Sequence, residues 1–289
     1  MKNRILESIL LMFFLLATSC SDDSGSTGPI EPKERVLSEI ITSDFKDGEE
    51  FNRIEEYFLN GKLYLKYTYE GNTLLAKVEY KYNSRGMVER IKYYNNDLFE
   101  EQDDFTYDST GRLIEYYSEN INAPTTAFFR EFEYPENNTI IERQKDYQKE
   151  PLRGGTFVYS LNEMNLIVKI ESEDSKIYEA DYDGNQILSV RTPTSVEYNY
   201  SYDDINLDQG DFYKKYFQSI YGQDVNNAAL YLSSLLDTPI VYSDKFLLTT
   251  TWENNLLRFD YVIDDEGFPL ERDEYYNEVL YSRTTYSYE

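Results

Sequence analysis

Hydrophobic and polar residues alternate along much of the chain from Phe51 onward. In the stretch KVEYKY, residues 77–82, charged residues take every second position, and Val78, Tyr80 and Tyr82 take the positions between them. Successive side chains of a β-strand point to opposite faces, so a period of two separates these residues onto a charged face and an apolar face. The pattern predicts antiparallel strands with one face in water.

A short motif recurs in these strands: an aromatic residue, any residue, then a tyrosine. The tyrosines that end the motif are Tyr69, Tyr82, Tyr107, Tyr134, Tyr159, Tyr200, Tyr261 and Tyr288. From Tyr82 to Tyr159 their spacings are 25, 27 and 25 residues. A strand takes about 8 to 10 residues and a hairpin turn about 4, so this period holds two strands and two turns. We therefore expect a chain of β-hairpins.

The residues between the strands favour hairpin turns. Segment 108–111, DSTG, opens with an aspartate and places glycine where a positive φ is needed, and segment 83–86, NSRG, repeats the arrangement. Shorter or shifted versions occur at 60–61, 70–72, 183–185 and 265–267.

One region departs from the hairpin pattern. Between residues 203 and 244, apolar residues recur at steps of three and four, which is the spacing of an amphipathic helix. We expect one or two short helices here, bounded by Gly210, Gly222 and Pro239. Such an insertion would cover an open sheet edge or a barrel mouth; a lid over a ligand site is the alternative.

The predicted fold class is therefore all-β. We expect antiparallel β-hairpin repeats that form a barrel or a strongly curved sheet, with a short helical insertion near residues 205–240.

The first residues have the features of an export signal. Lys2 and Arg4 precede the apolar run ILLMFFLLA, residues 9–17, which suits a signal peptide but is too short to span a bilayer as a helix. The sequence LATSC, residues 16–20, resembles the bacterial lipobox, and Cys20 is the only cysteine of the chain. We predict that residues 1–19 are removed and that Cys20 is lipidated and anchors the protein in a membrane. An ordinary secretory signal is the alternative.

Segment 20–34 is rich in serine, glycine, proline and acidic residues, so we expect a flexible tether. It leaves residues 35–289 as the β-hairpin-repeat domain. Asp22 and Asp23 resemble a signal that sends some Gram-negative lipoproteins to the outer face of the outer membrane. We therefore expect an outer membrane lipoprotein of a Gram-negative bacterium, with cell-surface exposure as a further expectation.

The composition argues against several functions. The chain has 28 Lys and Arg against 54 Asp and Glu, a net charge of -26, and no histidine. This charge would repel nucleic acid and anionic lipid headgroups. The missing histidine removes the commonest general base and most zinc and iron sites. We expect no enzymatic activity, no metal and no cofactor.

Two resemblances follow from these motifs. Segment 105–113, FTYDSTGRL, is similar to the core of the tyrosine–aspartate (YD) repeats of RHS-type secreted shell proteins, and segment 60–69, NGKLYLKYTY, is also repeat-like. The glycine that usually opens an RHS repeat is missing, and the period here is longer. From Phe51 to Glu289 the layout resembles more closely a family of bacterial lipoproteins of unknown function with a porin-like β fold. That resemblance implies a β-barrel and brings no ligand or catalytic residues.

Charged residues argue against strands that face lipid. Glu89 stands between Met87 and Ile91, and Glu115 between Leu113 and Tyr117. A charge on the lipid face of a membrane barrel costs about 2–4 kcal/mol at mid-depth. We expect a barrel or curved sheet that is surrounded by water and tethered by its lipid.

The acidic residues raise two possible kinds of site, a calcium loop and a catalytic pair of carboxylates. Segments 181–185 and 203–208 superficially resemble calcium loops but lack the EF-hand spacing, so we expect solvated turns. A pair of carboxylates for glycoside cleavage is the only catalytic option left without histidine, and the sequence does not show which two would be close.

Aromatic residues are the better candidates for ligand binding. Trp252, the only tryptophan, and Tyr213, Tyr216 and Tyr221 of the insertion can stack on sugar rings or fill a peptide groove. Cross-strand packing is the competing explanation for such rings.

The predicted function is a non-catalytic binding or structural module of the cell envelope, which contacts the membrane through its lipid and a glycan or protein at the cell surface. A carrier with its ligand inside a barrel and a carboxylate-based glycan hydrolase are the alternatives.

Overall fold

The computed structural model describes residues 35–135, 138–172, 176–184, 186–192, 196–202 and 247–289. Residues 36–289 form one compact unit, separate from the residues before it. The described residues contain eighteen strands and one 3-10 turn, η1 (Pro124–Thr126). The strands are β1 (Leu37–Lys46), β2 (Glu49–Leu59), β3 (Lys62–Glu70), β4 (Thr73–Tyr82), β5 (Val88–Asn95), β6 (Leu98–Tyr107), β7 (Leu113–Asn120), β8 (Phe128–Glu133), β9 (Thr139–Lys145), β10 (Pro151–Leu161), β11 (Ile167–Ser172), β12 (Lys176–Asp183), β13 (Gln186–Arg191), β14 (Glu197–Tyr202), β15 (Leu247–Trp252), β16 (Asn255–Ile263), β17 (Pro269–Tyr276) and β18 (Val279–Tyr288).

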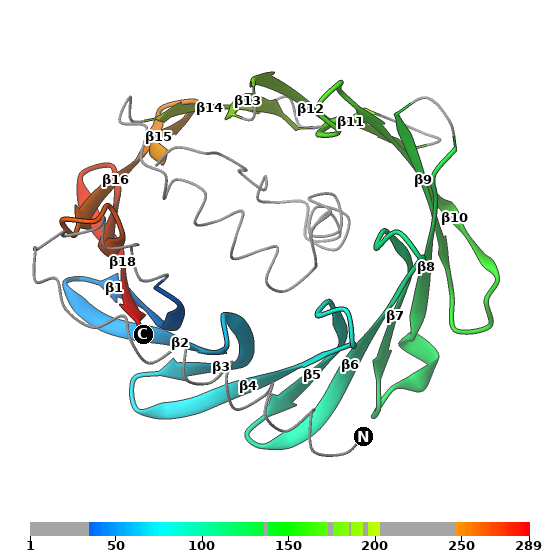
Figure 1. Cartoon of the computed structure of the whole chain (residues 1–289), viewed down its shortest axis with the longest axis horizontal. Helices are drawn as coiled ribbons and strands as arrows, with labels where there is room; N and C mark the ends of the chain where they lie inside the picture. The colour runs from blue at the N-terminus through cyan, green and yellow to red at the C-terminus, as the bar shows by residue number, and fades with distance from the viewer. Residues whose placement is uncertain (1–34, 136–137, 173–175, 185, 193–195, 203–246) are drawn as a thin grey trace, which may run out of the picture. The chain divides into compact units, whose positions relative to one another are not determined.

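The strands form one closed antiparallel barrel. Each strand pairs with its neighbours in the chain, and β1 pairs with both β2 and β18, so the ring has no open edge (Figure 1). This confirms the predicted all-β hairpin fold. It also decides between the barrel and the curved sheet, because the β1–β18 ladder closes the ring.

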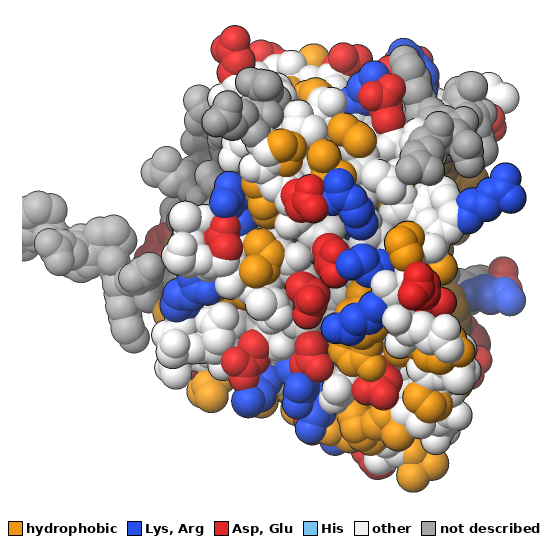
Figure 2. Space-filling model, turned by 90° about the vertical axis from the view of Figure 1, so that its right-hand side faces the viewer, with side chains coloured by type: hydrophobic (Ala, Val, Ile, Leu, Met, Phe, Trp, Pro, Cys, Tyr) orange, Lys and Arg blue, Asp and Glu red, His pale blue; other side chains and the backbone are white. Residues whose placement is uncertain are grey.

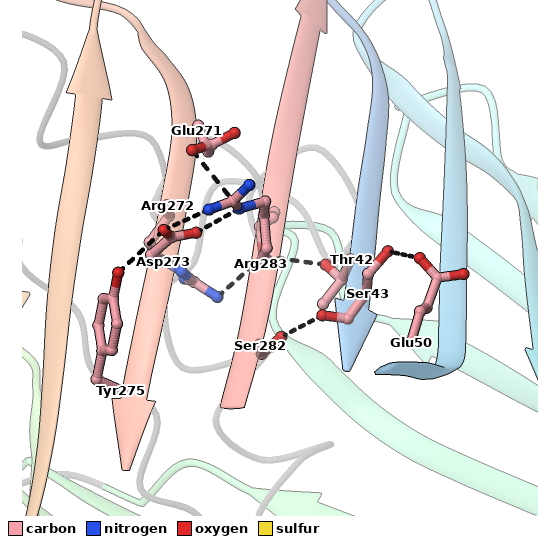
Figure 3. A network of polar contacts seen from close by, with 10 residues as sticks. Thr42, Ser43, Glu50, Glu271, Arg272, Asp273, Tyr275, Ser282 and Arg283 are labelled. Carbon is pink, nitrogen blue, oxygen red and sulfur yellow. Dashed lines mark hydrogen bonds and ion pairs between the residues drawn. The ribbon is translucent and has the colours of Figure 1, made fainter. Parts of the chain in front are cut away.

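Side-chain bonds reinforce the seam between the first and last strands. The hydroxyls of Thr42 and Thr284 lie 3.1 Å apart, and the Ser282 hydroxyl donates to the carbonyl of Ser43 at 3.3 Å (Figure 3). Closure therefore rests on side chains as well as on the backbone ladder.

The two faces of the sheet differ in composition. In Figure 3, Asp273, Tyr275 and Arg283 stand on the side of β17 and β18 that faces away from the rest of the ring. Arg283 donates two hydrogen bonds to Asp273, at 2.6 and 2.7 Å. We call this convex side the outer face and the concave side the inner face.

The inner face carries the core. The described sheet is a single layer, so side chains are most deeply buried on its concave side. The most buried apolar residues are Leu63, Val88, Leu113, Ile140, Ile187 and Val190, each 0% exposed. The predicted alternation in KVEYKY is confirmed, because Val78, Tyr80 and Tyr82 pack against this core and Lys77 forms an ion pair with Glu79 on the outer face.

Tyrosines at strand ends join neighbouring strands on the inner face. The Tyr134 hydroxyl, just after β8, donates to the carbonyl of Leu113 at the start of β7, at 2.6 Å. The same bond joins Tyr82 to Leu63, Tyr182 to Ile167, Tyr202 to Ile187 and Tyr288 to Pro269. Tyr107 ends β6 in the equivalent place, but its buried hydroxyl has no hydrogen-bond partner among the described residues. Several of the recurring tyrosines are thus structural.

The predicted turn chemistry is confirmed in detail. The Asp108 carboxylate accepts the N–H groups of Thr110 and Arg112 at 2.8 and 3.0 Å, and Gly111 has a φ of 93°. Burial opposes ionisation of Asp108, but its hydrogen bonds outweigh this effect and hold its pKa below 3.8. The same pair of side-chain bonds opens four other turns, at Asn83, Asp146, Asn162 and Asp264.

Ion pairs cover the outer face. Figure 2 shows Lys and Arg side chains beside Asp and Glu side chains across one side of the barrel wall. The pairs include Arg53–Glu55, Lys77–Glu79, Arg90–Asp104, Lys145–Glu131, Lys169–Glu171, Arg191–Glu179 and Arg283–Asp273.

Aromatic rings of the outer face also carry cations. Lys77 Nζ lies 4.0 Å from the centre of the Tyr94 ring, which is a cation–π distance. The other such pairs are Arg53 over Tyr69, Lys92 over Phe99, Lys149 over Phe129 and Arg258 over Tyr275.

The predicted signal peptide, the tether at 20–34 and the helical insertion near 205–240 lie outside the described residues. Within the described part of the chain, no helix is long and apolar enough to cross a membrane.

Candidate functional site

Trp252 is the last residue of β15 and lies on the inner face. It pairs with Tyr198 of β14 and with Asn255 of β16. Two residues along the same ladder, Tyr200 and Thr250 are buried on this face, at 9% and 8% exposure. Trp252 itself is half-buried. It therefore lies where the inner face meets solvent at one end of the barrel.

The Trp252 ring lies between two tyrosine rings. Its centre is 5.6 Å from that of Tyr198 and 6.0 Å from that of Tyr276, and the ring planes differ by 34° and 31°. Tyr276 ends β17, two strands away from β15, and the shorter side chain of Asn255 occupies the strand between them. We call Tyr198, Trp252, Asn255 and Tyr276 the aromatic shelf.

Tyr276 is held in place from both sides. Its hydroxyl donates to Asn255 Oδ1 at 2.6 Å. The next residue, Asn277, accepts the N–H of Leu256 through its side chain at 2.9 Å. Asn277 and Glu278 have φ angles of 47° and 68°, as in a tight hairpin turn with two left-handed residues. The shelf is therefore anchored to the ends of β16 and β17.

The shelf rings are only partly covered, since Tyr198 and Trp252 are half-buried. Tyr276 is 41% exposed. Among the described residues, no Lys or Arg lies over the three shelf rings, in contrast to the rings of the outer face. Trp252 Nε1–H and the Asn255 amide N–H groups likewise donate to no described residue. The shelf thus combines apolar ring surface with donors that are not taken up by any described residue.

The other predicted site residues are not brought to this place by any described contact. Cys20, Tyr213, Tyr216 and Tyr221 lie outside the described residues, so only Trp252 of the predicted set has a described position.

Two carboxylates of the inner face, those of Glu142 and Asp103, are almost completely buried. Glu142 of β9 receives two hydrogen bonds from Arg130 of β8, at 2.7 and 2.8 Å, and both side chains are 1% exposed. Gln144 donates to the same carboxylate at 2.8 Å, and so does the Tyr159 hydroxyl. Burial opposes ionisation of Glu142, but the attraction and hydrogen bonds of Arg130 and the bonds from Tyr159 and Gln144 hold its pKa below 4.5.

Asp103 of β6 is the second buried carboxylate, at 2% exposure. It accepts hydrogen bonds from the hydroxyls of Tyr93 and Tyr116 at 2.7 and 2.8 Å. Burial is the largest influence on this group and raises its pKa above 3.8, although the hydroxyls of Tyr93, Tyr116 and Ser118 work in the opposite direction.

Neither carboxylate faces solvent. Each is engaged by neighbouring side chains, so a substrate would have to displace those partners to reach it. This is the geometry of a structural polar core.

Acidic residues form no metal cluster in the part of the chain that the structure describes. Of the two acidic segments, 203–208 lies outside the described residues, and in 181–185 Asp181 accepts a hydrogen bond from Ser189 at 3.0 Å.

Tyr198, Tyr276 and the Arg130–Glu142 pair were missed by sequence reasoning. Tyr198 opens the motif YNY that ends at Tyr200, and this motif predicts only a strand. Grouping it with Trp252 needs the β14–β15 register, and grouping Tyr276 with Trp252 needs a contact across two strands.

Comparison with known proteins adds one structural likeness. No protein-family model matches the chain. No curated protein sequence matches it either. The chain is similar to the crystal structure of a porin-like protein from Bacteroides uniformis ATCC 8492, with 12% identity and a TM-score of 0.42 over 88% of this chain and 96% of that one.

Proposed function

We propose that this protein is a lipid-anchored module of the bacterial outer membrane whose barrel stands in water and binds a partner without catalysis. The lipid on Cys20 holds it at the membrane, and the tether at 20–34 separates the barrel from the bilayer.

The outer face is the observation that carries the proposal of a barrel in water. The ion pairs named above for this face are formed by residues of the strands and not of the turns. Examples are Arg90–Asp104 at 2.5 Å and Arg283–Asp273 at 2.6 Å. A strand that faces lipid pays a penalty for each such charge. Cations above Tyr94, Phe129 and Tyr275 add to this penalty, so the wall suits an aqueous surrounding.

The inner face supports a binding role in preference to a catalytic one. Asp103 and Glu142 are buried and engaged, whereas the aromatic shelf is open at the end of the barrel. A shelf of rings whose N–H donors bond to no described residue suits recognition of a ligand better than proton transfer.

The barrel in water can be tested with the compact unit, residues 36–289, which contains the whole closed ladder. We expect this unit to remain monodisperse in buffer without detergent and to give a β-type circular dichroism spectrum. A unit that folds only in detergent micelles would contradict the proposal.

The anchor can be tested in the full chain with Cys20→Ala. We expect wild-type protein to incorporate labelled fatty acid and to sediment with membranes, and the variant to do neither. Unchanged labelling of the variant would show that the lipid is attached elsewhere.

A further inference from the structure

We propose that the aromatic shelf is a binding site for a neutral oligosaccharide, with a sugar ring stacked on Trp252 and Tyr276. This inference rests on the proposed binding function and assigns it a site and a class of ligand.

The position of the shelf suits a ligand that enters from solvent. Trp252 ends β15, Tyr276 ends β17 and Tyr198 lies at the start of β14, so antiparallel pairing brings all three to the same end of the barrel. Two residues further along β14 from Tyr198, Tyr200 is only 9% exposed, whereas Tyr276 is 41% exposed. Aromatic side chains of the inner face therefore extend from the buried Tyr200 to the exposed Tyr276 at the end of the barrel.

The chemistry of the shelf matches a sugar ring. A pyranose has an apolar face of C–H groups and a rim of hydroxyls. The C–H groups pack on the electron-rich face of an aromatic ring. The hydroxyl oxygens can accept hydrogen bonds from Trp252 Nε1 and from the Asn255 amide nitrogen. The orientation of this amide is already fixed, because its oxygen accepts a hydrogen bond from the Tyr276 hydroxyl at 2.6 Å. Aromatic walls with a few fixed polar groups are typical of small-ligand sites.

Charge selects a neutral ligand. The chain carries a net charge of -26, and the described residues place no Lys or Arg over the shelf rings. Glu253 and Glu278 lie in the turns beside the shelf. An anionic glycan or a nucleic acid would meet repulsion there, and no described Lys or Arg lies over the shelf rings to offset it.

The aromatic rings of the outer face differ from the shelf rings, because cations cover several of them. Tyr275 is adjacent to Tyr276 in the chain but points to the opposite face, where Arg258 lies 4.2 Å from its ring centre. A ring that is already covered by a cation has no free face for a sugar. Tyr275 is therefore the matched control for Tyr276.

Trp252 supplies its own readout, because it is the only tryptophan of the chain. The full-length protein in detergent would be titrated with six-unit neutral probes, namely cellohexaose, maltohexaose, mannohexaose and xylohexaose, while tryptophan emission is recorded. We expect a saturable change in emission with at least one probe. Tyr276→Ala should weaken that binding about tenfold, and Tyr275→Ala should leave it unchanged.

Isothermal titration of Trp252→Ala with the same probe is the second measurement, and we expect a loss of about tenfold or more. Circular dichroism of each variant checks that the barrel is folded. The inference is overturned if folded wild type binds none of the probes, if Tyr276→Ala and Trp252→Ala bind as wild type does, or if only an anionic probe such as polygalacturonate binds. Each of these results leaves the proposed function standing as long as residues 36–289 stay soluble without detergent.

Discussion

Strands β8 and β9 carry ion pairs on both faces, and the two kinds of pair are built differently. On the inner face, Arg130 and Glu142 are 1% exposed and share two hydrogen bonds. On the outer face, Arg143 pairs with Glu133, and their side chains are 40% and 59% exposed. The same two strands thus bury one pair and expose the other.

The difference shows what each charge contributes. A buried ion pair has lost its hydration, so removing one partner leaves an uncompensated charge. An exposed pair keeps most of its hydration and contributes little. The inner pair therefore constrains how the wall packs, while the outer pairs suit the aqueous surroundings that we propose for the barrel.

Removing the buried arginine should have the largest effect. We expect Arg130→Met to lower the free energy of unfolding by about 3–5 kcal/mol, because Glu142 is left charged and buried. Urea unfolding followed by circular dichroism measures the loss. The double variant Arg130→Met with Glu142→Met removes both charges and should regain much of the stability. A single variant as stable as wild type would show that Glu142 is not confined as described.

The two buried carboxylates should respond to pH in opposite directions. The folded-state pKa of Glu142 is below 4.5, so its ionised form adds stability above that pH, and this stability is lost as the pH falls through the folded-state pKa. The folded-state pKa of Asp103 is above 3.8, so its protonated form favours folding below that pH, and this advantage is lost as the pH rises through the folded-state pKa.

Unfolding of Glu142→Gln and Asp103→Asn between about pH 3 and about pH 7 checks both signs. Relative to wild type, Glu142→Gln should lose most at neutral pH, and Asp103→Asn should improve as the pH rises. Parallel pH profiles for both variants would contradict the opposite environments of the two groups.

A smaller effect is expected from the tyrosines that join neighbouring strands. Tyr134→Phe removes the bond to the Leu113 carbonyl and should cost about 1 kcal/mol. Tyr107→Phe is its control, because the Tyr107 hydroxyl is buried without a hydrogen-bond partner among the described residues. We expect the control to be neutral or stabilising in thermal unfolding. Equal losses in both variants would mean that the bond to Leu113 contributes nothing.

The smallest effect should come from the outer face. Arg143→Met breaks the exposed pair with Glu133 and should change the free energy of unfolding by less than about 1 kcal/mol, with a smaller change in high salt. Denaturant unfolding at two salt concentrations measures it. A loss as large as that of Arg130→Met would remove the distinction between the two faces.

Local signals in the sequence predicted much of this fold. Asp108 with Gly111 and Asn83 with Gly86 identified turns, because a short polar side chain and a residue with positive φ must stand at fixed positions there. The equivalent turns at Asp146 and Asn162 were missed, because Lys149 and Asn165 take the positive φ in place of glycine, at 63° and 66°.

The register between neighbouring strands could not be predicted from the sequence. Arg130 and Arg143 are the same residue type in similar surroundings, and only the β8–β9 register places one inside and the other outside. For the same reason Trp252 could be selected as a lone ring, whereas its grouping with Tyr198 and Tyr276 depends on strands β14 to β17 lying side by side.

The seam between β1 and β18 has a consequence for biosynthesis. Thr42 and Thr284 are 242 residues apart in the chain, and the ladder they belong to is the one that closes the ring. A ribosome makes β1 early and β18 only after all the other strands of the barrel. The hydrogen-bonding edge of β1 that pairs with β18 therefore stays unpaired while those strands are synthesised. Loss of the ten residues of β18, Val279–Tyr288, would leave that edge and the edge of β17 permanently unpaired. The last strand to be made therefore determines whether the first one is safe from aggregation.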